Sequence, residues 1–242
     1  MALNFIRPES ADRFSVLIIG KAGIGKTSLL RTIPEDEPVC TLSAEAGLLC
    51  VRDLVQSGQV SGVEIRSLAE FKEALDALNS NEWKETYKWI FIDSLTEIAS
   101  RCVEEYQRRY PDKKDSFNLW GGYLDTMTSL IKAFRDLTSY NVIFTCLESV
   151  EVDEVKRRHI GPDIQGRQLK ERLTSYFDEV FYMTAIADEN GEEQRVFYTQ
   201  PRQNQPGKDR SGKLDEIEQP NLANIKAKIL GTAAAVTTSE SE

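Results

Sequence analysis

Histidine and cysteine are scarce in this sequence, which limits the metal and disulfide chemistry that it can support. One histidine, His159, and four cysteines occur among 242 residues. The cysteines, at positions 40, 50, 102 and 146, lie far apart and form no C-x-x-C pair. We therefore expect neither a zinc site nor a disulfide framework, and we expect a cytoplasmic location.

Long apolar runs are also missing. No stretch reaches about 18 consecutive apolar residues, the length that a membrane-spanning helix needs. The first dozen residues lack a basic segment followed by an apolar one, which a secretory signal would show. We therefore expect no membrane contact and no secretion.

Positive charge is in the minority, with 30 Lys and Arg against 39 Asp and Glu and a net charge of −9. This balance argues against coating duplex DNA by bulk charge, because such binding depends on neutralising phosphates. Any contact with nucleic acid must be local. The length fits one domain, expected at residues 1–231, and the small and acidic residues of 232–242 predict a disordered tail.

Short apolar runs alternate with helical stretches through the first two thirds of the chain. Each run is typical of a strand buried on both faces of a parallel sheet, and the alternation indicates βαβ crossovers with helices on both faces. The fold class predicted is therefore α/β. The expected strands are Phe14–Ile19, Val39–Leu42, Val63–Ile65, Trp89–Ile92 and Val142–Leu147, and the expected helices are Thr27–Ile33, Ala69–Asn79, Leu95–Arg109 and Leu119–Ser139.

The last third of the chain has a different pattern. Two apolar runs, Glu179–Ala187 and Gln194–Gln200, flank Asn190-Gly191, and Asn-Gly is a strong hairpin signal. We expect antiparallel strands that extend the sheet here. A final helix is predicted over Leu222–Leu230.

One motif decides the functional class. Residues 20–27 read GKAGIGKT, a full match to the P-loop pattern G-x-x-x-x-G-K-[ST], between a predicted strand and a predicted helix. Its glycines let the backbone fold around phosphates, Lys26 would reach the β and γ phosphates, and Thr27 would ligate Mg²⁺. The predicted nucleotide-binding residues are Gly20, Ala22, Gly23, Ile24, Gly25, Lys26, Thr27 and Ser28.

Acidic residues follow three of the predicted strands. Asp93 closes the run WIFID, the Walker B pattern, and is expected to hold magnesium through water. Ser94 follows it instead of a second acid, so a catalytic base must lie elsewhere. Glu45 is the candidate for orienting the attacking water, and Glu148 is the candidate γ-phosphate sensor. The alternative for Glu45 is an exposed loop glutamate.

These motifs together resemble the RecA-like core ATPases, and no N-K-x-D motif points to guanine nucleotides. Shorter segments, LWG at 119–121, GPDIQGR at 161–167 and KDR at 208–210, extend the resemblance to the phage single-strand annealing proteins of the Sak class, within the phage AAA-type nucleotide-binding family. The resemblance covers about Phe14–Leu230. It implies a RecA-like core that binds ATP and Mg²⁺, hydrolyses ATP slowly, and acts on single-stranded DNA with a single-strand binding protein in the host cytoplasm.

The resemblance also implies further functional residues. In RecA-like proteins the loop after the Glu148 strand faces DNA, and here the polar segment Ser149–Pro162 contains Lys156, Arg157 and Arg158. Three cations can pair with DNA phosphates, although acidic residues lie just upstream and a solvated loop is the alternative. A second basic and aromatic stretch, from Tyr106 to Trp120, could stack bases or pack inward.

RecA-like proteins assemble head to tail as rings or filaments, and cations late in the core commonly enter the neighbour's ATP site. Lys208 and Arg210 are the candidates for such a role, with a solvated loop as the alternative. Two other functions stay open: a nucleotide-switched loader or regulatory ATPase without direct DNA binding, and a small-molecule kinase.

Overall fold

The computed structural model describes residues 13–232, except residues 46, 189 and 203. The predicted tail at 232–242 lies, apart from Thr232, outside the described residues. Among the described residues, no helix combines the length and the apolar composition needed to cross a bilayer.

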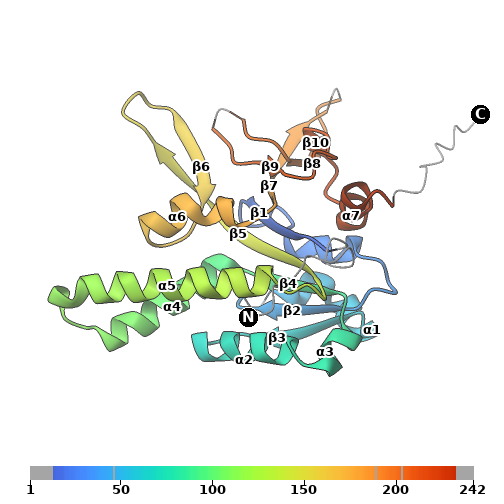
Figure 1. The fold of residues 1–242 in the computed structure, drawn as a ribbon. Coiled ribbons are helices and arrows are strands. Elements are labelled where there is room, and N and C mark those ends of the chain that lie inside the picture. The colour runs from blue at the N-terminus through green and yellow to red at the C-terminus, as the bar shows by residue number, and fades with distance from the viewer. Residues whose placement is uncertain (1–12, 46, 189, 203, 233–242) are drawn as a thin grey trace, which may run out of the picture.

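A twisted, mostly parallel sheet forms the centre of the molecule, as predicted (Figure 1). Six neighbouring strands pair in parallel in the order β7-β1-β5-β4-β2-β3, and β8 and β10 extend the sheet in antiparallel pairing beyond β7. The strands are β1 Ser15–Gly20, β2 Val39–Ser43, β3 Val60–Glu64, β4 Trp89–Asp93, β5 Asn141–Val152, β6 Arg158–Pro162, β7 Glu179–Ala187, β8 Glu193–Tyr198, β9 Lys208–Asp209 and β10 Ile217–Glu218.

Helices cover both faces of the sheet because its central strands are apolar on both sides. In β1, Leu17 and Ile19 belong to one buried cluster and Val16 and Ile18 to another. Helices α2, α4, α5 and α6 pack in the first cluster, and η2, η3 and α7 pack in the second. The helices are α1 Arg52–Ser57, α2 Leu68–Leu78, α3 Asn81–Thr86, α4 Leu95–Arg109, α5 Ser116–Arg135, α6 Arg167–Leu173 and α7 Leu222–Leu230, with the 3₁₀ helices η2 Thr27–Thr32, η3 Leu48–Val51, η4 Lys113–Asp115 and η5 Thr174–Tyr176.

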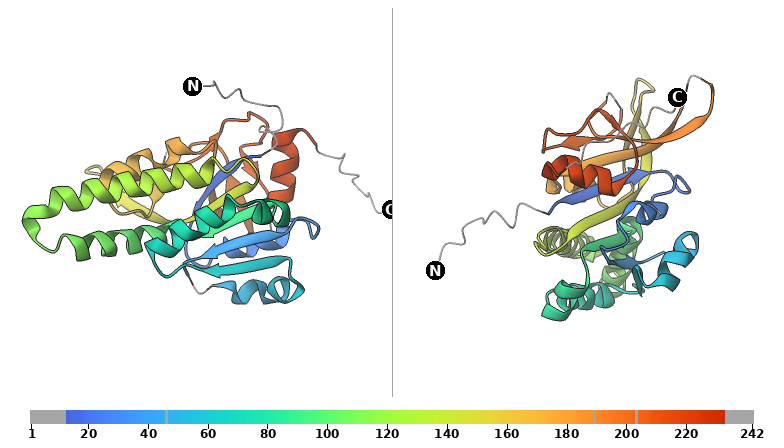
Figure 2. Two further views of the ribbon diagram at one scale, coloured as in Figure 1. Left: turned by 60° about the horizontal axis from the view of Figure 1, so that its bottom comes forward. Right: turned by 90° about the vertical axis from the view of Figure 1, so that its right-hand side faces the viewer.

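The predicted boundaries hold well where a cap or a turn marks the end of an element. Ser67 caps α2 by accepting a hydrogen bond from the backbone N–H of Glu70. Helix α4 and strand β7 have the predicted bounds. The 3₁₀ turn η4 runs directly into α5, so this helix begins earlier than expected, and α4 and α5 pack together and extend past the sheet (Figure 2).

The predicted helix after the P-loop is a short 3₁₀ helix instead of an α-helix. Its backbone bonds join residues three apart, as in Leu29 N–H to the Lys26 carbonyl. Pro34 keeps Ile33 extended, which leaves only two turns for the element.

The prediction of a polar loop at Ser149–Pro162 is wrong, because this segment forms a β-hairpin. Strand β5 continues to Val152 and pairs antiparallel with β6. Asp153 closes the turn, since its carboxylate accepts from the backbone N–H groups of Val155 and Arg157. The β-branched residues Val150 and Val152 favour this extended conformation.

Candidate nucleotide site

The P-loop leaves the carboxyl end of β1 in a conformation that requires its glycines. A Cβ at Gly20 would lie 2.6 Å from the carbonyl oxygen of Met183, so no larger side chain fits there. Gly23 and Gly25 have φ values of 74° and 105°, in the left-handed region that glycine adopts without strain. The loop therefore has the tightly turned backbone that binding of phosphates by N–H groups needs.

Lys26 lies at the centre of the loop and is largely buried. Its ammonium group donates hydrogen bonds to the carbonyls of Gly20 and Lys21, both at 2.8 Å. Burial lowers the pKa of Lys26, and the negative charges of Asp93, Glu45 and Glu148 partly offset that shift. The three predicted acidic residues thus all act on the charge of this one ammonium group.

Thr27 and Asp93 are in direct contact. The Thr27 hydroxyl donates to Asp93 Oδ2 at 2.6 Å, and the Thr145 hydroxyl donates to Asp93 Oδ1 at 2.5 Å. A hydroxyl and a carboxylate at one point are the oxygen donors that Mg²⁺ prefers. The residues present therefore fit the ion, and Thr27 and Asp93 are the pair that would hold it.

Glu45 follows β2 and is exposed, at the same edge of the sheet. Its carboxylate accepts a hydrogen bond from the Ser94 hydroxyl at 2.5 Å. The backbone N–H of Ala44 donates to the Asp93 carbonyl at 2.7 Å, which fixes the start of this loop to the end of β4. Glu45, the predicted base, is therefore hydrogen-bonded to Ser94, the residue that follows Asp93.

Glu148 lies in β5, three residues after Thr145. The Tyr182 hydroxyl donates to Glu148 Oε2 at 2.8 Å. Burial and this bond raise the pKa of Tyr182 to about 12, so the phenol keeps its proton near neutral pH. Glu148 is thereby fixed at the beginning of the β5–β6 hairpin, where it pairs with Pro162.

The three predicted DNA-binding cations lie at the end of that hairpin. Lys156 and Arg157 are in the turn and Arg158 begins β6, and all three side chains are exposed. Two of the three nearby acids have other partners, since Glu151 pairs with Lys170 and Asp153 with His159, while Glu154 has no ion pair among the described residues. Among the described residues, none of the three cations has an ion-pair partner.

Lys208 and Arg210 lie at the opposite edge of the sheet from the P-loop of their own chain. Strand β9 pairs with the beginning of β7, and Lys208 donates to the Phe177 carbonyl at 2.5 Å. Arg210 forms an ion pair with Asp178. Neither cation can therefore reach the nucleotide site within one subunit, and the predicted role in a neighbour's site stays a prediction.

Three residues of the site region were missed or not fully assigned from the sequence. Ser94 was noted only as the absence of a second acid, and Tyr182 was treated as part of a strand. Thr145 was expected to be able to share the γ-phosphate sensor role of Glu148, but its signal was not separable from core packing. A polar residue within an otherwise apolar strand was the available signal for Thr145. No comparable signal exists for Ser94 or Tyr182, because their partners are distant in sequence.

Comparison with known proteins agrees with this geometry. A family model described as AAA domain matches residues 12–211, which covers the P-loop, Asp93 and both hairpins. No curated protein matches the chain. Domains of this type bind ATP with Mg²⁺ and act as nucleoside triphosphatases through the P-loop and Walker B residues. The α/β fold and this match agree, and the chain belongs to the AAA domain family of P-loop proteins.

Proposed function

We propose that this protein is a phage recombination ATPase of the Sak class, which binds single-stranded DNA and promotes annealing or strand pairing. It is proposed to work with a single-strand binding protein and to assemble head to tail as a ring or filament. The AAA domain match supports the ATPase part of this proposal. The arrangement of β5 supports the DNA part.

The nucleotide site would act through a small set of side chains. Lys26 would exchange its two backbone carbonyl partners for phosphate oxygens when ATP binds. Thr27 and Asp93 would hold Mg²⁺, which neutralises phosphate charge. Glu45, held by Ser94, would accept the proton of the attacking water. Glu148 would respond to the γ phosphate through its contact with Tyr182.

Strand β5 is the observation that carries the link to DNA. This one strand contains Thr145, bonded to Asp93, and Glu148, and then continues without a break into the β5–β6 hairpin. A change at the phosphates would therefore act on the same rigid element that carries the exposed cations of the hairpin turn. Three cations without carboxylate partners suit a phosphate backbone.

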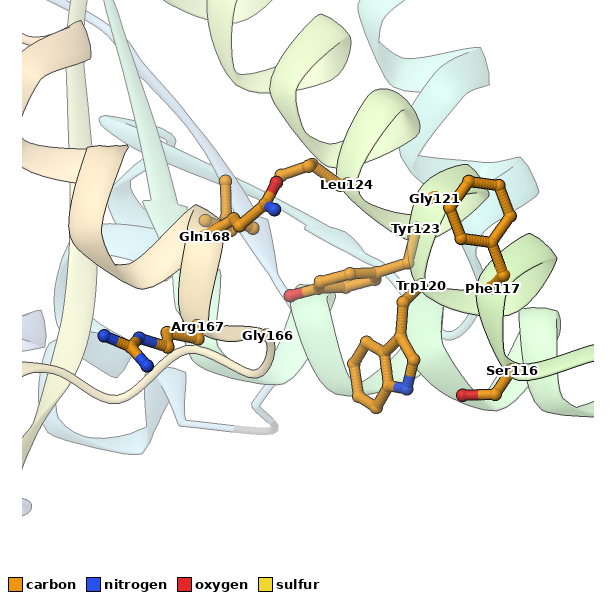
Figure 3. Close-up of a pocket in the computed structure, with 10 residues that line it drawn as sticks. Ser116, Phe117, Trp120, Gly121, Tyr123, Leu124, Gly166, Arg167 and Gln168 are labelled. Atoms are coloured by element: carbon orange, nitrogen blue, oxygen red, sulfur yellow. The ribbon is translucent and has the colours of Figure 1, made fainter. Parts of the chain in front are cut away.

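A cavity lined by α5 and α6 adds a place for bases (Figure 3). It measures about 890 Å³ and lies between the beginnings of α5 and α6. Phe117 and Trp120 line it and are 87% and 42% exposed, which is unusual for large aromatic side chains. Lys170 of α6 pairs with Glu151 of the hairpin, so the helix whose beginning lines the cavity is joined to the hairpin that carries the cations. Aromatic faces next to cations are the usual combination for binding single strands.

The test is binding of a fluorescent single-stranded oligonucleotide, measured by anisotropy with no nucleotide, with ADP and with a slowly hydrolysed ATP analogue. We expect tighter binding with the ATP analogue than with ADP. Trp120→Ala should weaken binding about tenfold, the scale of one lost base stack. Leu49→Ala, which removes an exposed apolar side chain elsewhere, should have no effect.

Binding that is absent in every nucleotide state, in a protein that still hydrolyses ATP, would contradict the DNA part of the proposal. That result would favour the loader or regulatory ATPase. Transfer of the γ phosphate to a nucleoside or another small molecule, in place of release to water, would favour the kinase.

A further inference from the structure

The β7–β8 hairpin extends past the beginning of the P-loop. Gly20, the last residue of β1, lies opposite Met183 of β7, and β7 continues for four residues beyond this point to Ala187. Arg195 of β8 pairs with Ala185, two residues past Met183. The hairpin therefore places Arg195 beside the loop that follows Gly20.

Strand alternation sets the side on which Arg195 lies. Its neighbour Val196 belongs to the core cluster on the face covered by α4 and α5. Phe197, two residues from Arg195, belongs to the cluster that contains Leu29 and Leu30 of η2. Arg195 and Phe197 share a face, so Arg195 projects on the side of the sheet that carries the P-loop and its helix.

The guanidinium group of Arg195 lies against the P-loop backbone. A Cβ built on Gly25 would come within 2.7 Å of Arg195 Nη1 and 3.1 Å of its Cζ. Arg195 is exposed, and its side chain has no hydrogen bond or ion pair within the described part of the chain. With Lys21 and Lys26, Arg195 brings the number of positive groups at the loop to three.

We propose that Arg195 is a nucleotide-binding residue that contacts the polyphosphate of the nucleotide bound to its own chain. This inference rests on nucleotide binding at the P-loop, as in the proposed function. The planar guanidinium can donate two parallel hydrogen bonds to phosphate oxygens. It lies beside Gly25, the residue directly before the phosphate-binding Lys26. A single subunit thus has its own phosphate-facing arginine, separate from any cation supplied by a neighbour.

Displacement of a fluorescent ADP analogue tests the assignment, with MgATP and Mg²⁺-tripolyphosphate as the competitors. Arg195→Gln should weaken both competitors by about tenfold, because both carry the phosphates that the arginine contacts. Arg195→Lys should recover part of the loss. Arg172→Gln, at an exposed arginine on α6 away from the loop, should match the parent.

Three results would overturn the assignment. Unchanged affinity of Arg195→Gln for both competitors would show that Arg195 does not contact the polyphosphate. A loss confined to ATP would place the arginine at the base or ribose. A lower unfolding temperature of the ligand-free Arg195→Gln protein would show that Arg195 stabilises the P-loop structurally instead of binding the nucleotide. If the parent protein binds neither competitor, the proposed function fails as well, and the parent measurement separates that case from failure of Arg195 alone.

Discussion

Ser94 holds two groups in place at the end of β4. Its hydroxyl donates to Glu45, and it accepts from the backbone N–H of Glu97 in the first turn of α4. A loop carboxylate is thereby tied to the residue after Asp93, even though the sequence has no second acid there. The Glu45 carboxylate gains a fixed position that an unattached loop glutamate would lack.

Glu45→Gln should keep the affinity for ATP while lowering turnover about 10²-fold, the usual scale for losing a general base. Ser94→Ala should lower turnover less, because the carboxylate remains but loses its positioning bond. Steady-state ATPase rates and nucleotide affinities measured on both variants check this. If Glu148→Gln abolishes basal hydrolysis while Glu45→Gln is silent, the two roles are reversed.

Glu179 is a buried carboxyl group that the nucleotide site does not use. It lies at the amino end of β7, where it is 2% exposed and accepts a hydrogen bond from the backbone N–H of Ser211. Burial and the neighbouring Asp209 raise the pKa of Glu179 to about 8. The carboxyl is therefore protonated in the folded protein at neutral pH, unlike a glutamate in an unfolded chain.

Glu179 should make stability depend on pH in a defined direction. Below about pH 4.5 the group is protonated in both states and has no effect. As the pH rises from there to about 8, the unfolded chain loses the proton and the folded protein keeps it, so folding is progressively destabilised. Glu179→Gln removes this effect. The unfolding temperature of Glu179→Gln, measured by calorimetry, should rise relative to that of the parent between pH 5 and pH 8. A difference between the two unfolding temperatures that stays constant over this range would contradict the raised pKa of Glu179.

At the scale of elements, the β5–β6 hairpin concentrates the cations at one exposed turn. Neutralising Lys156, Arg157 and Arg158 together should weaken single-strand binding and lower the slope of log affinity against log salt by about 2. Each phosphate contact on a single strand contributes roughly 0.7 to that slope. Equilibrium binding over a salt series measures it. Unaltered affinity and slope would show that the hairpin cations do not contact DNA, and would leave the aromatic cavity as the remaining candidate site or exclude DNA binding.

The sequence predicted those elements whose signals are local. The P-loop strand, the Asn-Gly hairpin and helix α4 depend on residues within a few positions of one another, and all three are confirmed. The β5–β6 hairpin was missed because its polar residues hide the strand pattern. Arg195 was missed for a different reason: its place beside Gly25 comes from the register of β7 on β1 and of β8 on β7.

At the scale of the whole molecule, the charged sites lie at opposite edges of the sheet. The P-loop, Asp93, Glu45 and Glu148 meet at the carboxyl edge, while Lys208 and Arg210 lie at the amino edge. Head-to-tail assembly would join one edge to the other. Lys208 and Arg210 would then act either in the nucleotide site of the neighbouring subunit or in no nucleotide site.

Complementation separates those two cases. Arg210→Ala should bind ATP normally yet lose turnover by several powers of ten, if it removes an arginine finger. Lys26→Ala should lose turnover while keeping its Arg210. Mixing the two inactive proteins should restore part of the ATPase rate at mixed interfaces. No recovery, while each variant still assembles with the parent, would show that Arg210 serves no neighbouring site.

The most direct test of the account is the ATPase rate of the parent protein with and without single-stranded DNA. The account predicts Mg²⁺-dependent hydrolysis that single-stranded DNA stimulates, with Lys26→Ala inactive in both conditions and Asp93→Asn altered chiefly in its magnesium titration. Glu148→Gln should retain basal hydrolysis and lose the stimulation. Hydrolysis at the parent rate by Lys26→Ala, or a parent rate that single-stranded DNA leaves unchanged, would contradict the account.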